Sequence, residues 1–289
     1  MTEREKLMYE ILGQISSANA PIIFKGGLIT QLILSENGFT SFQRATVDID
    51  ANWVDAPPSM DKLTDTIVNA LGVLNDQFSI EPSREYGENK SAGLNILDKA
   101  SGLKILSMDI DIKPLSNYRT YYFGEMKIKG VLANEILADK ICTVSSDLVY
   151  KHRAKDLIDI YALAQCTNVN TTEIYETIKS KDKEIQSFNG LLSRKSDVQH
   201  AYSKLKRIEN KPTFDKMYSY LCNFLKPFIQ HDLTEKIWVP SQELWKQSKA
   251  LEKAPFSRAK LKAAAQSIEQ QSGSDHGKSK VHKKDDPSL

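Results

Sequence analysis

The segment Thr46-Val47-Asp48-Ile49-Asp50 alternates apolar and acidic side chains, as a half-buried β-strand does. Because successive side chains of a strand point to opposite faces, Asp48 and Asp50 are predicted to share one face. Two carboxylates on one side of a strand suit Mg²⁺, which takes few protein carboxylates and keeps sites for substrate phosphates. A lone Asp-x-Asp is more often a solvated strand face, so this segment needs support from elsewhere in the chain.

A glycine turn upstream offers such support. Ile22-Ile23-Phe24 is a short apolar run typical of a strand, Lys25-Gly26-Gly27 follows it, and residues 28–34 have a helical pattern. Glycines that open a helix expose backbone N–H groups and the positive end of the helix, where phosphate oxygens can bind. Taken alone, a Gly-Gly at a strand end is more often only a tight turn, and Lys25 could equally be a surface charge.

A second acidic strand is predicted at Met108-Asp109-Ile110-Asp111-Ile112, where Asp109 and Asp111 again share a face. A third carboxylate from a neighbouring strand would let two metal ions be bridged, one activating a hydroxyl and one holding a triphosphate. Either Asp109 or Asp111 could supply that carboxylate, since both face the same way.

Helical periodicity dominates from Val131 onward. One helix carries Lys140 at the margin of its apolar face, so the ammonium could point into a cleft and offset phosphate charge, although lysine stems commonly lie along apolar surface. The next predicted helix, 154–165, places Asp156 one turn from Arg153 and Asp159. Asp156 is therefore expected to pair with Arg153 or to reach Lys140 across the helix contact.

The chain of 289 residues is long enough for two globular modules, or for one large domain with a helical extension. We expect a core domain over 1–130 and a helical C-terminal domain over 131–256 that completes the active site. The last stretch, 257–289, loses large apolar residues and becomes rich in Ser, Lys and Gln, so it is predicted to be disordered.

Composition limits the possible partners. Hydrophobic residues at 40% and charged residues at 26% are typical of soluble globular proteins, and the net charge of +2 gives no global attraction to nucleic acid. Nucleic-acid binding would need a local basic patch, for which the candidates are Arg194, Lys195, Lys204, Lys206 and Arg207.

The chain lacks a run of about 18 apolar residues, so we expect a cytoplasmic protein with no membrane contact. Its three cysteines, Cys142, Cys166 and Cys222, indicate neither a disulfide framework nor a zinc site.

Four motifs follow one another in a recognisable order and spacing: Phe24-Lys25-Gly26-Gly27, Arg44-x-Thr46-x-Asp48-Ile49-Asp50, Leu137-Ala138-Asp139-Lys140 and Arg153-Ala154-Lys155-Asp156-Leu157-Ile158-Asp159-Ile160-Tyr161. Together they resemble the motif set of the AbiEii/AbiGii family of toxin nucleotidyltransferases, over about residues 21–164. The resemblance implies an α+β fold: a nucleotidyltransferase core of the DNA polymerase β type, with a mixed sheet flanked by helices, followed by a helical C-terminal region.

The resemblance also implies roles for single positions. It assigns nucleotide binding to Lys25, Gly26, Gly27 and Thr46, metal binding to Asp48 and Asp50 with Asp109 or Asp111, and catalysis to Asp48, Asp50, Lys140 and Asp156. The cofactor implied is Mg²⁺ or Mn²⁺, and the substrate is a nucleoside triphosphate. The role of Asp156 is the least defined of these.

The function implied is that of an abortive-infection toxin, which transfers nucleotides to an RNA acceptor, the tRNA 3′ end, blocks translation and is neutralised by a cognate antitoxin. One alternative is a nucleotide-dependent phosphotransferase or hydrolase without an RNA acceptor, because the same metal site would bind the same triphosphate. A second alternative is a non-catalytic binding scaffold. Mutual repulsion makes clustered carboxylates costly, which argues against a scaffold that keeps Asp48, Asp50, Lys140 and Asp156 together.

Overall fold

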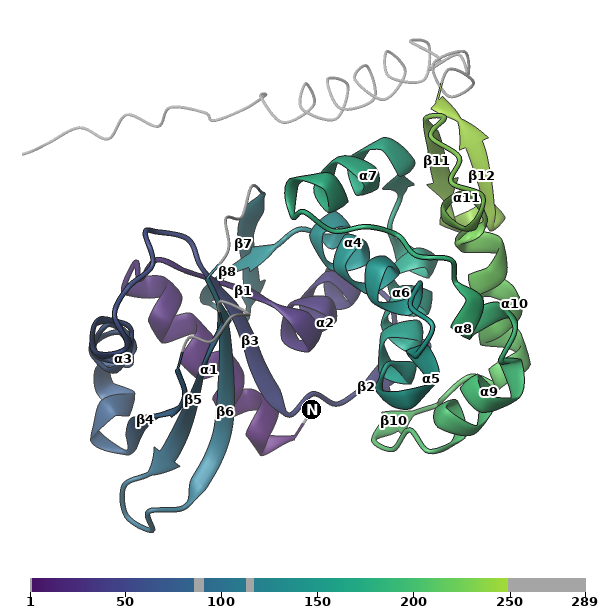
Figure 1. Cartoon of the computed structure of the whole chain (residues 1–289). Helices are drawn as coiled ribbons and strands as arrows, with labels where there is room; N and C mark the ends of the chain where they lie inside the picture. Colours follow the sequence, from purple (N-terminus) through teal and green to yellow (C-terminus); the bar gives the residue numbers. More distant parts are fainter. Residues whose placement is uncertain (1, 86–90, 113–116, 249–289) are drawn as a thin grey trace, which may run out of the picture. The chain divides into compact units, whose positions relative to one another are not determined.

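A seven-stranded mixed sheet occupies the first half of the chain (Figure 1). The computed structural model describes residues 2–85, 91–112 and 117–248, so the predicted disordered tail, 257–289, lies outside the described residues. In spatial order the strands are β4 (Phe78–Arg84), β5 (Ser91–Asp98), β6 (Lys104–Asp111), β3 (Asp48–Trp53), β1 (Ile22–Lys25), β8 (Met126–Val131) and β7 (Tyr118–Phe123). β3 runs parallel to β6 and β1 runs parallel to β8, whereas the other neighbours are antiparallel.

Helices cover both faces of this sheet (Figure 1), which confirms the predicted α+β class. On one side α1 (Glu3–Ser17) contacts α3 (Met60–Ala70), which continues into a short 3₁₀ helix (Gly72–Asp76). On the other side α2 (Gly26–Glu36) packs against β1 and β3. α1 begins with a capping box, in which Thr2 and Glu5 accept each other's backbone N–H groups, and it buries Ile11 and Ile15 against the sheet.

The predicted first helix and first strand are confirmed, but the acidic strand starts later than expected. β3 begins at Asp48, not at Thr46. The residues before it pair elsewhere: β2 (Gln43–Arg44) forms a two-stranded sheet with β10 (Ile208–Glu209), and the Ala45 N–H donates to the Arg207 carbonyl. This long-range pairing places residues 43–45 in a separate sheet, and Thr46 and Val47 connect that sheet to β3.

The remainder of the described chain is mainly helical, as expected. Its helices are α4 (Ala133–Val144), α5 (Val149–His152), α6 (Ala154–Cys166), α7 (Thr171–Ser180), α8 (Asn189–Leu192), α9 (Lys195–Ser203), α10 (Phe214–Phe224) and α11 (Lys226–Ile229). None of the helices in the described ranges is long and apolar enough to cross a membrane. The three cysteines carry free thiols.

A three-stranded sheet within this helical part was not predicted. It consists of β9 (Val169–Asn170), β11 (Lys236–Val239) and β12 (Leu244–Gln247), with a 3₁₀ turn (Pro240–Gln242) between the last two strands. The sheet places Trp238 in a cluster of rings with Tyr220, Phe224 and Trp245, whose centroids lie 5.2–5.7 Å from that of Trp238. The Trp238 Nε1–H also donates to the Ala164 carbonyl on α6 at 2.7 Å. Trp238 is fully buried, so it fixes the back of α6.

We predict that Trp238→Ala lowers the free energy of unfolding by about 3–5 kcal/mol, because it removes a buried ring and leaves a cavity behind α6. Leu244→Ala, at a position that is 40% exposed on the same small sheet, is the control and should change stability by no more than about 0.5 kcal/mol. Urea unfolding of both variants measures the difference. Equal effects would show that Trp238 does not anchor α6.

Candidate active site

The glycine turn and the acidic strand meet at Gly26. β1 pairs antiparallel with β3, so that Lys25 lies opposite Asp50, and Gly26 then opens α2 with a φ of +67°. A Cβ atom on Gly26 would lie 2.0 Å from Oδ2 of Asp50. Only a glycine therefore permits both this backbone conformation and this approach of the carboxylate.

Gly27 makes a second close approach. A Cβ atom there would lie 2.6 Å from Oγ1 of Thr46. No side chain caps the N-terminus of α2, where Lys25 occupies the capping position without a capping hydrogen bond. The first backbone N–H groups of an α-helix have no partner within the helix, so this N-terminus can receive an anion.

The donor set beside Gly26 fits a divalent ion bound by few protein ligands. Asp48 and Asp50 alternate with the fully buried Ile49 along β3, and Asp109 of β6 lies beside Asp50 in the parallel register. Burial raises the pKa of Asp50, while the ammonium groups of Lys25 and Lys140 act in the opposite direction. A divalent cation would relieve the same cost of burying this carboxylate.

The third carboxylate does not complete a cluster. Asp111 pairs with Lys25 at 2.6 Å, and Asp109, at the more exposed position, pairs with Arg84 at 2.9 Å. Within the described ranges no group of three or more His, Cys, Asp or Glu side chains is close enough to hold a metal ion. A metal ion held by Asp48 and Asp50, with Asp109 or Asp111 as the third carboxylate, stays a prediction.

Lys140 belongs to a buried ion-pair network. Its Nζ lies 2.6 Å from Oδ1 of Asp156 and 2.8 Å from Oδ2 of Asp159, so the expected reach of Asp156 to Lys140 is observed. Arg153 is a distant partner, at 3.8 Å from the other Asp156 oxygen. Burial alone would lower the pKa of Lys140, but the carboxylates of Asp159 and Asp156 raise it, which keeps the ammonium charged.

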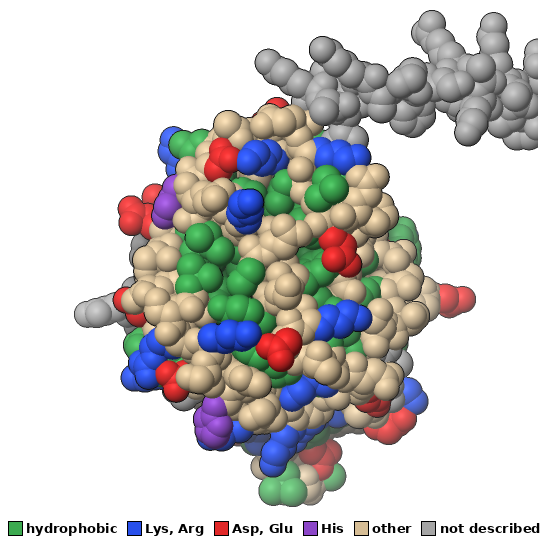
Figure 2. All heavy atoms as spheres, turned by 90° about the vertical axis from the view of Figure 1, so that its right-hand side faces the viewer, with side chains coloured by type: hydrophobic (Ala, Val, Ile, Leu, Met, Phe, Trp, Pro, Cys, Tyr) green, Lys and Arg blue, Asp and Glu red, His purple; other side chains and the backbone are tan. Residues whose placement is uncertain are grey.

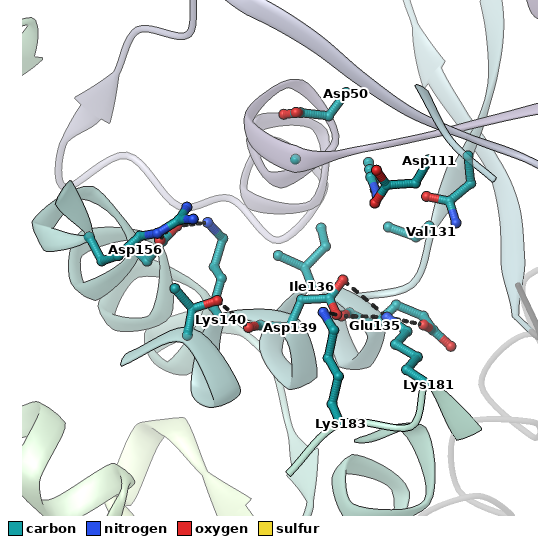
Figure 3. Close-up of a pocket in the computed structure, with 15 residues that line it drawn as sticks. Asp50, Asp111, Val131, Glu135, Ile136, Asp139, Lys140, Asp156, Lys181 and Lys183 are labelled. Atoms are coloured by element: carbon teal, nitrogen blue, oxygen red, sulfur yellow. Dashed lines mark hydrogen bonds and ion pairs between the residues drawn. The ribbon is translucent and has the colours of Figure 1, made fainter. Parts of the chain in front are cut away.

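These groups surround a cleft of about 320 Å³ between the sheet and α4, which we call the sheet–helix cleft (Figure 3). Asp50 and Asp111 lie on its sheet side and Lys140 and Asp156 on its helix side (Figure 3). Its charged lining consists of five cations, Lys25, Lys140, Arg153, Lys181 and Lys183, and five carboxylates, Asp50, Asp111, Glu135, Asp139 and Asp156. Of the residues predicted for the site, Asp48, Gly27, Thr46 and Asp109 are not part of this lining.

Lys181 and Lys183 were not predicted as site residues. They follow α7 and reach back over α4, where Lys181 pairs with Glu135 at 2.7 Å and Lys183 with Asp139 at 2.6 Å (Figure 3). In the sequence they belong to an ordinary charged stretch, 179–184, which is typical of a solvated helix end. Only the packing of α7 on α4 brings them to the cleft.

Two of the five basic residues considered for nucleic-acid contact are in ion pairs with carboxylates. Arg194 pairs with Asp197 at 2.6 Å, and Lys195 pairs with Asp215 at 3.1 Å. On the face seen in Figure 2, Lys and Arg side chains are interspersed with acidic and hydrophobic ones. A nucleic-acid surface at these residues stays a prediction.

Gly26→Ala tests the close approach of Asp50. We expect it to destabilise the protein by about 1–2 kcal/mol for the left-handed backbone and by about 1–3 kcal/mol more for the collision with Asp50. Gly38→Ala is the matched control, since Gly38 has a φ of +66° and open space around its Cβ position. Urea unfolding of both variants gives the comparison. Equal losses would mean that Asp50 moves away at no cost.

The ion-pair network predicts a specific acid sensitivity. Burial alone would raise the pKa of Asp159, but Lys140 and Arg44 hold it below its ordinary value. Such a group contributes stability above its unfolded pKa of about 4, and the contribution is lost as the pH falls towards the folded pKa. The difference in unfolding free energy between the wild type and Asp159→Asn should therefore shrink from neutral pH to about pH 3.5. A constant difference in urea unfolding across that range would contradict this.

Comparison with solved structures finds remote similarities. The Helicobacter pylori protein JHP933 is 14% identical with a TM-score of 0.40, over 78% of this chain and 99% of that one. MenT4, a nucleotidyltransferase toxin from Mycobacterium tuberculosis, is 14% identical with a TM-score of 0.41, over 80% and 91%. An antigenic nucleotidyltransferase-like protein from Paracoccidioides brasiliensis is 16% identical with a TM-score of 0.42, over 75% and 98%. At these values the likeness carries no inference about function.

The family of the chain follows from its sequence. No curated protein matches the chain. The family model described as the nucleotidyl transferase AbiEii toxin of type IV toxin–antitoxin systems matches residues 10–230, which include the sheet, the glycine turn and the whole ion-pair network. The chain therefore belongs to the AbiEii family of nucleotidyl transferase toxins.

Proposed function

We propose that this protein transfers nucleotides from a nucleoside triphosphate to an RNA acceptor, the tRNA 3′ end, with the help of Mg²⁺ or Mn²⁺. The transfer would block translation, and a cognate antitoxin would neutralise the protein. Membership of a nucleotidyl transferase toxin family supports the reaction class and the existence of an antitoxin. The acceptor, the metal ion and the role of each site residue are the proposal.

The observation that carries the proposal is the contact between Gly26 and Asp50. It sets a carboxylate that faces the sheet–helix cleft against the uncapped N-terminus of α2. A carboxylate for a cation beside backbone donors for an anion suits a metal-bound triphosphate. A bound divalent ion would supply charge neutralisation and acidify the attacking hydroxyl.

The groups of the proposed site, of which Asp48 and Gly27 lie outside the lining of the cleft, then have distinct roles. Asp48 and Asp50 would hold the ion, and the N–H groups at Gly26 and Gly27 would hold phosphate oxygens. Lys140 uses two of its three N–H donors on Asp156 and Asp159, which leaves one for a phosphate. Holding the reacting groups in place in this way accounts for most of the catalysis of nucleotide transfer.

Oδ2 of Asp156 fits a contact with the substrate, because the ion pair that it makes with Arg153 is long, at 3.8 Å. This oxygen is buried and accepts no hydrogen bond from the described residues, and Asp156 lines the cleft. A buried carboxylate oxygen without a donor is costly, so a donor on the substrate would stabilise the complex. We therefore assign two roles to Asp156, which orients Lys140 through Oδ1 and accepts a hydrogen bond from the substrate through Oδ2.

Incubation with total tRNA, Mg²⁺ and each α-labelled nucleoside triphosphate in turn tests the function. We expect label on RNA with the wild type and a loss of at least about a thousandfold with Asp48→Ala or Asp50→Ala, since metal-held phosphate neutralisation supplies much of the rate. Glu36→Ala, on the far end of α2, is the control and should retain activity.

The products separate the alternatives. Release of pyrophosphate together with labelled RNA supports nucleotide transfer. Formation of labelled nucleoside diphosphate without labelled RNA would replace it by hydrolysis, if inorganic phosphate is released, or by phosphoryl transfer, if it is not. The absence of labelled RNA and of labelled diphosphate with all nucleotides would favour a binding scaffold.

A further inference from the structure

Arg44 joins the β2 segment to the ion-pair network at the site. Its Nε and Nη2 donate to the two oxygens of Asp159 at 2.7 and 2.9 Å, which is a bidentate pair. The Asp159 side chain is only 4% exposed and that of Arg44 17%. Asp159 Oδ2 also receives Lys140 at 2.8 Å, so Arg44 and Lys140 share one buried carboxylate.

Arg44 lies outside the sheet–helix cleft. Arg44 and Asp159 line a second cavity of about 900 Å³, which also includes Gly27, whereas Lys140 and Asp156 line the cleft. A Cβ atom on Gly27 would lie 3.2 Å from Nη2 of Arg44, so the guanidinium sits directly behind the glycine turn. It therefore acts on the cleft through its charge and through the residues that it pairs with, without touching a ligand there.

The charges of the four buried groups balance only with Arg44 present, because Arg153, the further partner of Asp156, is 53% exposed and lies 3.8 Å away. Arg44 and Lys140 contribute two positive charges, and Asp156 and Asp159 contribute two negative charges. Without Arg44 the network would carry one net negative charge beside the cleft. Both oxygens of Asp159 would then be left to Lys140 alone, which would draw its ammonium away from the cleft.

We propose that Arg44 is a positioning residue: it occupies both oxygens of Asp159, and so keeps the network neutral and leaves the ammonium of Lys140 available to the triphosphate. This rests on the proposed function for the identity of the ligand. The Arg44–Asp159 pair then sets the net charge beside the phosphate site, and it also links β2 to α6.

A series of variants that remove or keep these charges tests the proposal. The measurement is nucleotide binding alone, with Mg²⁺, each of the four nucleoside triphosphates and no RNA. Arg44→Gln should weaken binding of the preferred nucleotide about ten- to hundredfold, as expected for one uncompensated charge near the site. Arg44→Gln combined with Asp159→Asn restores neutrality and should return the affinity to within about threefold of the wild type. Arg44→Lys keeps the charge but cannot form the bidentate pair, so it should recover part of the affinity that Arg44→Gln loses.

Arg119→Gln is the control, because Arg119 forms an ion pair with Glu36 on α2 away from the cleft and should not affect binding. Urea unfolding of each variant confirms that it is folded. If the double variant binds no better than Arg44→Gln, the pair is merely structural and the proposal is overturned. Wild-type affinity in Arg44→Gln would overturn it too.

The outcome separates this inference from the proposed function. A charge rescue in nucleotide binding, together with no label on RNA, would leave the inference standing and remove the RNA acceptor. A wild-type protein that binds none of the four nucleotides would overturn both.

Discussion

The architecture of the site depends on one close approach, that of the Asp50 carboxylate to the Cα atom of Gly26. Because Gly26 carries no side chain and adopts a positive φ, β1 can turn directly into α2 while β3 runs alongside. The strand carboxylates and the helix N-terminus consequently face the same space. The parallel pairing of β3 with β6 and the helices on both faces hold this geometry in place.

The second determinant is electrostatic. Four charged groups from three separate segments, Arg44, Lys140, Asp156 and Asp159, neutralise one another with side chains that are at most 17% exposed. Removing one partner from such a network is far more disruptive than its net stabilising effect suggests, because it leaves a buried charge without compensation. The network therefore joins α4 and α6 to the chain that leads into β3.

Local sequence was sufficient to predict the parts of the site that depend on local rules. Alternation located β3 and β6, and the glycine pair located the turn into α2. One-turn spacing offered Arg153 as a partner of Asp156, which lies closer to Lys140 on another helix. Residues brought in by tertiary packing could not be found this way. Lys181 and Lys183 reach the cleft only because α7 packs on α4, and the two-residue strands at Arg44 and Ile208 are too short to show any period.

A contact that supports α6 comes from near the end of the described chain. Trp238, which covers the back of α6, lies 74 residues beyond the Ala164 carbonyl that it contacts. A growing chain therefore has the glycine turn, the strand carboxylates and α6 in place well before it can bury the apolar back of α6. Burial of the back of α6 is deferred until almost the whole described chain has been synthesised.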